Sequence, residues 1–367
     1  MDSDLLILVI VVATALTFDF TNGFHDTANV VATSISTRAL APRTAVALAA
    51  VLNFAGAFIS LQVAATVAND VVDASSITLT VIFAGLIGAI SWNLITWYFG
   101  LPSSSSHALI GGMVGAAFAA AGTGAIMGEG ILAKILIPAL LAPIVAFAVG
   151  ALAIMISYRV VGKQRPGPVN RGFRLGQIIS GSMLALAHGT NDAQKTMGVI
   201  TLALIAHGTL DADNFEVPFW VVVSAATAIA LGTYSGGWRI IRTMGTRIIK
   251  MDTAQGFSAQ GAGASVILAA SNFGFPLSTT HVISGGVVGA GAGKRLSAVR
   301  WGVAGNIFVA WLMTLPAAAA FGAAAYGVTQ VFGSGALGPV IVSLIGLTLL
   351  AAAFVKRLRA GAPVPAG

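Results

Sequence analysis

Two polar segments interrupt long apolar stretches of this sequence and share much of their composition. The first is residues 22–29 (NGFHDTAN) and the second is residues 188–195 (HGTNDAQK), where Asp192 repeats Asp26 after 166 residues. An ionised Asp in hydrocarbon is costly, so such a residue usually faces a cavity, a partner or a bound ion. We therefore expect a duplicated site inside a membrane, in which Asp26 and Asp192 bind protons or cations.

Two short motifs combine a proline with hydroxyl side chains and a histidine, at residues 102–107 (PSSSSH) and 276–281 (PLSTTH). This pattern is typical of a helix N-terminus, whose free N–H groups and positive dipole end bind anions. Two such ends at membrane depth could hold a tetrahedral oxyanion, although ordinary helix capping is the alternative. The hydroxyl donors would be Ser104, Ser105, Ser106, Ser278, Thr279 and Thr280.

The remaining polar side chains of the two segments suit cation coupling. Asn22, Asn29 and Asn191 offer amide oxygens of the kind that bind Na⁺ or a hydrated divalent ion. Lys195 occupies the repeat position of Asn29, and it could pair with an Asp, contact a bound anion or replace a bound cation. The structural alternatives are a hydrogen-bond network between helices, with Lys195 extended to the membrane interface.

Composition sets the class of protein. The 367 residues are 57% hydrophobic and 8% charged, with a mean hydropathy of +0.91, whereas soluble domains have roughly 25% charged residues. This predicts a polytopic helical membrane protein. The lack of cysteine excludes disulfides and thiolate metal sites. No nucleoside-triphosphate loop motif and no nucleophile–base pair occur, so we expect a gradient-driven transporter and no enzyme.

The net charge of +7 does not indicate nucleic-acid binding, because 17 of the 19 Lys and Arg residues fall in five short clusters between apolar stretches. We expect the protein to lie in the plasma (inner) membrane, and the positive-inside rule places these clusters on its cytoplasmic side. The N-terminus would then be outside the cell and the C-terminus in the cytoplasm. The first span is expected to be retained. The acidic residues that alternate with the clusters are Asp2, Asp4, Asp70, Asp73, Glu129, Asp211, Asp213 and Glu216.

The order of spans predicts two inverted-topology repeats, each with three spans and a re-entrant helical hairpin, which is typical of secondary transporters. Residues 1–158 form the first half, 159–174 a basic cytoplasmic linker, 175–326 the second half and 337–355 an extra C-terminal span. The expected spans of the two halves are 4–35, 44–67 and 131–157, then 175–206, 218–237 and 299–325. The expected hairpins are 78–99 with 105–121, and 258–273 with 279–292.

Several isolated polar residues have two interpretations. Asp19, two turns before Asp26, belongs to the coupling path or caps a kink. Gln260, at the start of the second expected hairpin, could line the cavity. The histidines of the motifs carry protons or have structural roles; they are His25, His107, His188 and His281.

Together, the two polar segments and the two hairpin tips resemble the inorganic phosphate transporter (PiT) family over roughly residues 20–110 and 175–300. The resemblance implies symport of inorganic phosphate with Na⁺ or H⁺ and no other cofactor. It implies that Asp26, Asn29 and Asp192 serve coupling, that the six tip hydroxyls hold phosphate, and that the protein forms a homodimer in membrane lipid.

One residue that differs from the pattern of Na⁺-coupled members indicates which branch of the family the sequence resembles. Lys195 stands where Na⁺-coupled members have Asn, and with residues 255–260 (QGFSAQ) it resembles the bacterial low-affinity branch. That branch implies H⁺ coupling and transport of phosphate complexed with a divalent metal. A fixed ammonium also disfavours a second cation beside it. Na⁺-coupled phosphate symport, a sulfate or other oxyanion permease, and a passive anion channel are the alternatives.

Overall fold

The computed structural model describes residues 3–73, 77–211, 215–333 and 335–359, with side chains as far as residue 348. Asp2 and Asp213, two of the acidic residues used to predict the topology, lie outside these ranges. Within these ranges the regular secondary structure is helical apart from one isolated bridge between Val72 and Ile126. The first-half helices are α1 (Ser3–Ser36), α2 (Pro42–Gly56), α3 (Gln62–Asn69), α4 (Leu79–Phe99), α5 (Ser105–Ala121), α6 (Gly128–Gly130) and α7 (Ile137–Val161). The second-half helices are α8 (Pro166–Ala206), α9 (Phe219–Ser235), α10 (Trp238–Arg242), α11 (Thr253–Asn272), α12 (Thr279–Lys294) and α13 (Trp301–Gln330), followed by α14 (Leu337–Arg359).

The protein is an all-helical, multi-pass membrane protein. Within the described ranges, five helices are long and apolar enough to cross a membrane, and a bent pair raises this to six. α8 falls outside this set although it has 41 residues, since its polar segment lowers its hydropathy. The five are Ser3–Ser36, Leu79–Phe99, Ser105–Ala125, Gly128–Val161 and Trp301–Gln330.

The second predicted span, 44–67, is wrong as a single helix, because it breaks into α2 and α3. Side chains of the second polar segment stabilise the break. The Gln194 Oε1 atom accepts hydrogen bonds from the Val63 and Ala64 N–H groups at 2.8 and 3.3 Å. These are first-turn donors of α3 that have no partner within their own helix.

The fifth predicted span, 218–237, is followed by a sharp bend that the sequence did not predict. α9 ends at Ser235, and the helical segment 238–247 turns by 59° from it. Gly236 has a φ of +71°, a conformation that side chains other than glycine rarely adopt. The predicted basic linker, 159–174, is mostly helical, because α7 extends to Val161 and Pro166 begins α8.

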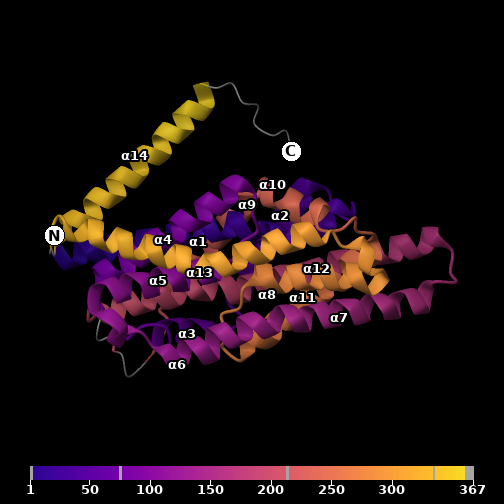
Figure 1. The fold of residues 1–367 in the computed structure, drawn as a ribbon, viewed down its shortest axis with the longest axis horizontal. Coiled ribbons are helices and arrows are strands. Elements are labelled where there is room, and N and C mark those ends of the chain that lie inside the picture. Colours follow the sequence, from indigo (N-terminus) through magenta and orange to yellow (C-terminus); the bar gives the residue numbers. More distant parts are fainter. Residues whose placement is uncertain (1–2, 74–76, 212–214, 334, 360–367) are drawn as a thin grey trace.

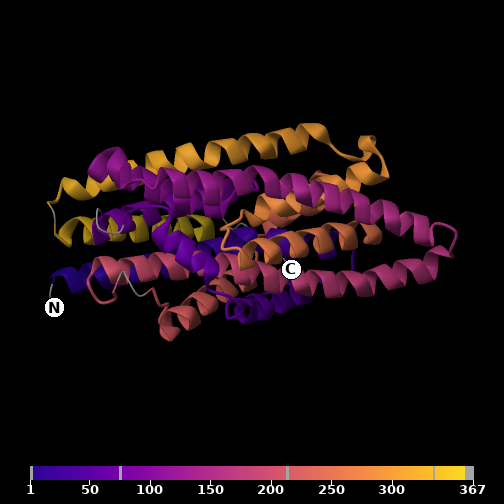
Figure 2. The same cartoon turned by 90° about the horizontal axis from the view of Figure 1, so that it is seen from below.

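The two helical hairpins lie at opposite ends of the bundle. In Figure 1, α4 and α5 occupy one half of the long axis and α11 and α12 the other, while α13 and α7 run along both; Figure 2 shows the same elongated bundle from below. α14 extends away from the bundle. The hairpins are packed crosswise: α13 of the second half lies against α5, and α7 of the first half lies against α12.

Glycines permit this crosswise packing. A Cβ atom at Gly115 of α5 would lie 2.0 Å from the Ala319 carbonyl oxygen, and one at Gly289 of α12 would lie 2.1 Å from that of Phe147. Small residues of this kind let helix backbones approach closely in a membrane, where dispersion contacts replace the hydrophobic effect as the packing force. Each hairpin is thus held in place by a helix from the other half.

Candidate functional site

The hairpin tips are helix N-termini in the interior of the protein. The Ser104 hydroxyl accepts a hydrogen bond from the His107 N–H group at 3.1 Å, and Ser278 accepts from His281 at 3.3 Å. These are N-caps of α5 and α12, as the sequence predicted. The two tips meet, since the rings of His107 and His281 lie 4.7 Å apart.

Asp26 of α1 connects the two tips. Its carboxylate accepts hydrogen bonds from Ser105 of the first tip at 2.7 Å, and from Thr279 and Thr280 of the second at 3.2 and 3.5 Å. The His25 ring adds a contact of 2.7 Å between Nδ1 and Asp26 Oδ1. Asp26 therefore accepts hydrogen bonds from hydroxyl groups of both tips and also contacts a ring of its own helix.

Asp192 of α8 is stabilised chiefly by an ion pair. Its Oδ1 atom pairs with the Lys195 ammonium, and its Oδ2 atom lies 3.1 Å from His188 Nε2. Lys195 also donates to the Ser106 hydroxyl at 2.5 Å and to the Leu277 carbonyl at 2.8 Å. Lys195 therefore does not extend to the membrane interface: it lies at the meeting point of both tips and is 1% exposed.

The three asparagines have separate partners. Asn29 donates to Thr279 and Thr280 at 3.3 and 2.9 Å, and Asn22 donates to Asp192 at 3.5 Å. Asn191 points elsewhere, to the Ser271 hydroxyl and the Phe275 carbonyl at 2.9 and 3.1 Å. Eleven of the twelve predicted site residues thus lie at the tips or contact them or Asp192, and Asn191 instead links α8 to the second hairpin.

Sequence reasoning missed several partners of this network. The Leu277 carbonyl accepts from both Lys195 and Ser106, although its side chain carries no signal. Ser103 contacts Thr96 at 2.9 Å and His25 Nε2 at 3.4 Å. The PSSSSH motif already contained Ser103, whereas Thr96 lies in an apolar stretch and could not have been singled out.

Asp26, His188 and Asp192 each bring one potential ligand atom into a cluster whose atoms lie within 4.8 Å of one another. The carboxylates already accept hydrogen bonds from Ser105 and pair with Lys195. A cation would have to displace the ammonium of Lys195, which repels it. The donor set fits a hydrogen-bonded ion network better than a metal site.

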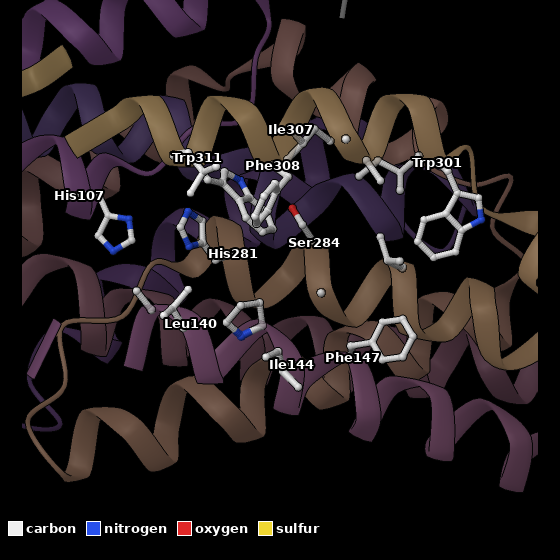
Figure 3. A pocket seen from close by; sticks show the side chains of 18 of the residues that line it. His107, Leu140, Ile144, Phe147, His281, Ser284, Trp301, Ile307, Phe308 and Trp311 are labelled. Carbon is white, nitrogen blue, oxygen red and sulfur yellow. The ribbon is translucent and has the colours of Figure 1, made fainter. Parts of the chain in front are cut away.

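A cavity of about 740 Å³ lies between α7, α12 and α13 (Figure 3). Its lining is mostly apolar, including Leu140, Phe147 and Phe308, with His107 and His281 at one end. None of the twelve predicted site residues lines it. An apolar cavity cannot replace the hydration of an anion, so the tip network is the better candidate site.

Comparison with known proteins gives the family. The sequence profile of the phosphate transporter family matches residues 22–169 and 162–322. A protein of Mycobacterium bovis named "Probable low-affinity inorganic phosphate transporter" is 54% identical over 91% of this chain and 80% of its own length. A Bacillus subtilis protein of the same name is 47% identical over 89% and 98%.

A solved structure has the same fold. It is titled "The sodium-dependent phosphate transporter" and is 24% identical, with a TM-score of 0.78 over 89% of this chain and 99% of its own. At that identity the likeness concerns the fold alone. The family match and the bacterial relatives decide the classification: this chain belongs to the phosphate transporter family, whose members are transporters and not enzymes.

Proposed function

We propose that this protein is a secondary active symporter that takes up inorganic phosphate together with H⁺. The observation that carries the proposal is the meeting of two capped helix N-termini with a buried ammonium in the core of a phosphate transporter family member. Helix N-termini, hydroxyl donors and Lys together suit an oxyanion. Phosphate complexed with a divalent metal is the form that the bacterial relatives' branch implies.

Phosphate would bind between the tips, at Ser104, Ser105, Ser106, Ser278, Thr279 and Thr280. Support comes from the present partners of these hydroxyls. Ser105 and Thr279 donate to the Asp26 carboxylate, and Ser106 donates to the Leu277 carbonyl. A hydroxyl that donates to a carboxylate can donate to a phosphate oxygen after a rotation about its C–O bond.

The coupling network would be Asp26, Asn29, Asn22, Asp192, Asn191 and Lys195. Lys195 favours H⁺ over Na⁺ as the coupling ion, since a fixed ammonium repels a second cation beside it. Its contacts with Ser106 and Asp192 support this role.

Transport would follow from rocking of one inverted half against the other around the tips. The crosswise packing of α13 on α5 and of α7 on α12 supports two hairpin-centred bodies. The N-terminus would lie outside and the C-terminus in the cytoplasm, as the basic clusters favour. The homodimer stays a prediction from resemblance.

The function is tested by uptake of labelled phosphate into cells that lack their own phosphate transport. Asp26→Asn and Asp192→Asn should each abolish uptake while membrane expression stays normal. Normal uptake in both variants would refute the proposal. Competition by excess sulfate would indicate a broader oxyanion permease, and insensitivity to a protonophore would indicate a passive channel.

The coupling ion is tested in proteoliposomes with an imposed H⁺ gradient, with and without Na⁺. We expect accumulation of phosphate that follows the H⁺ gradient and needs no Na⁺. Uptake that requires Na⁺ and ignores the pH gradient would overturn the role given to Lys195.

A further inference from the structure

Asp19 of α1 is a third buried carboxyl in the core. It is 0% exposed, and neither of its oxygen atoms has a hydrogen-bond partner within the described ranges. Thr196 and Asn22 are its polar neighbours, but neither makes a hydrogen bond of normal geometry with it. The Thr196 hydroxyl and the Asn22 amide oxygen are likewise buried without a partner in the described chain.

The other two carboxylates differ from Asp19 in this respect. Asp26 has three hydroxyl donors and a His contact, and Asp192 has an ammonium and a His contact. A buried charge without partners is far more costly than one that is hydrogen-bonded or paired. Of the three, Asp19 is therefore the carboxyl that is stable when it carries a proton.

The charged groups that face Asp19 come from one helix. Asp192 and Lys195 of α8 interact with it electrostatically. α4 and α9, two of the other helices that pack on α1, contain no Asp, Glu, Lys, Arg or His. The position that corresponds to Asp19 in the second half is Ala185, so this acid has no counterpart there.

The position of Asp19 along α1 also matters. Seven residues separate it from Asp26, which corresponds to about 10 Å along a helix towards the N-terminus. If the N-terminus is outside, Asp19 lies between the outer surface and the tips. A proton that arrives from outside would therefore meet Asp19 before the phosphate site.

We infer that Asp19 is the residue that holds the transported proton, an assignment that rests on the proposed H⁺ symport. A phosphate anion that enters beside Asp26 and Asp192 adds negative charge, which favours the protonated, neutral form of Asp19. By linkage, the proton strengthens phosphate binding by the same factor. The proton leaves the carboxyl oxygen to water when phosphate leaves on the cytoplasmic side, so one proton crosses with each phosphate by this route.

The test uses purified full-length protein in proteoliposomes and two assays with labelled phosphate. Asp19→Asn mimics the protonated side chain. It should retain at least half of the wild-type rate of phosphate exchange at equal concentrations, which needs no net proton movement. It should lose accumulation driven by an inward H⁺ gradient, at least 10-fold. Asp19→Glu should restore gradient-driven accumulation, and Asp4→Asn, an exposed acid of the same helix, should behave as wild type.

The outcomes separate this inference from the proposed function. Gradient-driven accumulation by Asp19→Asn would overturn the role of Asp19 while H⁺ symport stands. Failure of the wild-type protein to respond to the H⁺ gradient would overturn the symport itself. If Asp19→Asn has lost exchange as well, Asp19→Glu decides: exchange without gradient-driven accumulation in that variant would also refute the inference.

Discussion

The two polar segments hold equivalent aspartates by different means. His and Asn exchange places between them: Asn22 and His25 precede Asp26, whereas the corresponding positions before Asp192 are His188 and Asn191. Each Asp nevertheless contacts one His ring, at 2.7 and 3.1 Å. The repeat thus conserves the contact and not the position of the residue that makes it.

The larger difference is in charge. Asp26 accepts hydrogen bonds from neutral hydroxyls and contacts the His25 ring, while Asp192 pairs with the ammonium of Lys195. Among the buried acidic residues and lysines of the described chain, Asp19 in the first half and Lys195 in the second lack a counterpart of the same kind, since Ala185 and Asn29 stand at the corresponding positions. The duplicated site is therefore asymmetric in its buried ionisable residues.

Removal of the Lys195 ammonium, which only the second half has, should have the largest effect on stability and transport. Lys195→Met leaves Asp192 without its cation, and breaking a buried ion pair from one side costs about 3–5 kcal/mol. We expect a clear loss of thermal stability in detergent and no phosphate uptake.

A double variant identifies the cause. Asp192→Asn combined with Lys195→Met removes both charges, so it should recover part of the lost stability without recovering transport. Equal unfolding temperatures for the single and double variants would show that the unpaired carboxylate is not what destabilises the protein.

Matched substitutions of the two histidines compare the halves directly. His25→Asn removes the ring contact of Asp26, and hydrogen bonds to charged groups contribute about 1.5–3 kcal/mol, or roughly 10- to 100-fold in an equilibrium. We expect a fall of that size in the rate of labelled phosphate uptake. His188→Asn should have a smaller effect, because Lys195 still holds Asp192. A greater loss for His188→Asn would contradict this view of the two sites.

Much of this site could be predicted from the sequence because its residues are conspicuous in apolar surroundings. An Asp, an Asn or a run of hydroxyl residues between apolar stretches has few explanations other than function or helix capping. The occurrence of a similar hydroxyl run in both halves makes capping alone a weaker explanation. The N-caps at Ser104 and Ser278 follow from local chemistry, which depends on neighbouring residues alone.

What could not be predicted depends on contacts between distant segments. The break between α2 and α3 needs Gln194, more than 120 residues away, to accept from Val63 and Ala64. The role of the Leu277 carbonyl depends on backbone position and not on residue type. Both carboxyl oxygens of Asp19 lack a hydrogen-bond partner within the described ranges, and this depends on the arrangement in three dimensions, which no local pattern reveals.

The bases of the two hairpins differ as well. Asp252 caps α11 through a hydrogen bond from the Gln255 N–H group at 2.8 Å, and it also accepts from Tyr158 at 2.6 Å and Lys294 at 2.9 Å. Thr78, which caps α4 in the first hairpin, makes no side-chain cap hydrogen bond. Of the two hairpins, only the second is therefore linked to α7 by a hydrogen bond from Tyr158 to the capping carboxylate of Asp252.

Removing the charge of Asp252 should produce the smallest effect, and one that depends on pH. Burial raises the pKa of this carboxyl, but hydrogen bonds from Tyr158, the Gln255 N–H group and Lys294 outweigh it and lower the pKa below the ordinary value. A carboxylate with a lowered pKa contributes stability above its unfolded pKa, about 3.9, and loses it as the pH falls through the folded value. Asp252→Asn keeps a good N-cap, so it should cost at most about 1 kcal/mol near neutral pH. The difference in unfolding temperature from wild type should shrink as the pH falls below about 4. A difference that stays constant over that range would mean that Asp252 acts through its shape and capping geometry and not through its charge.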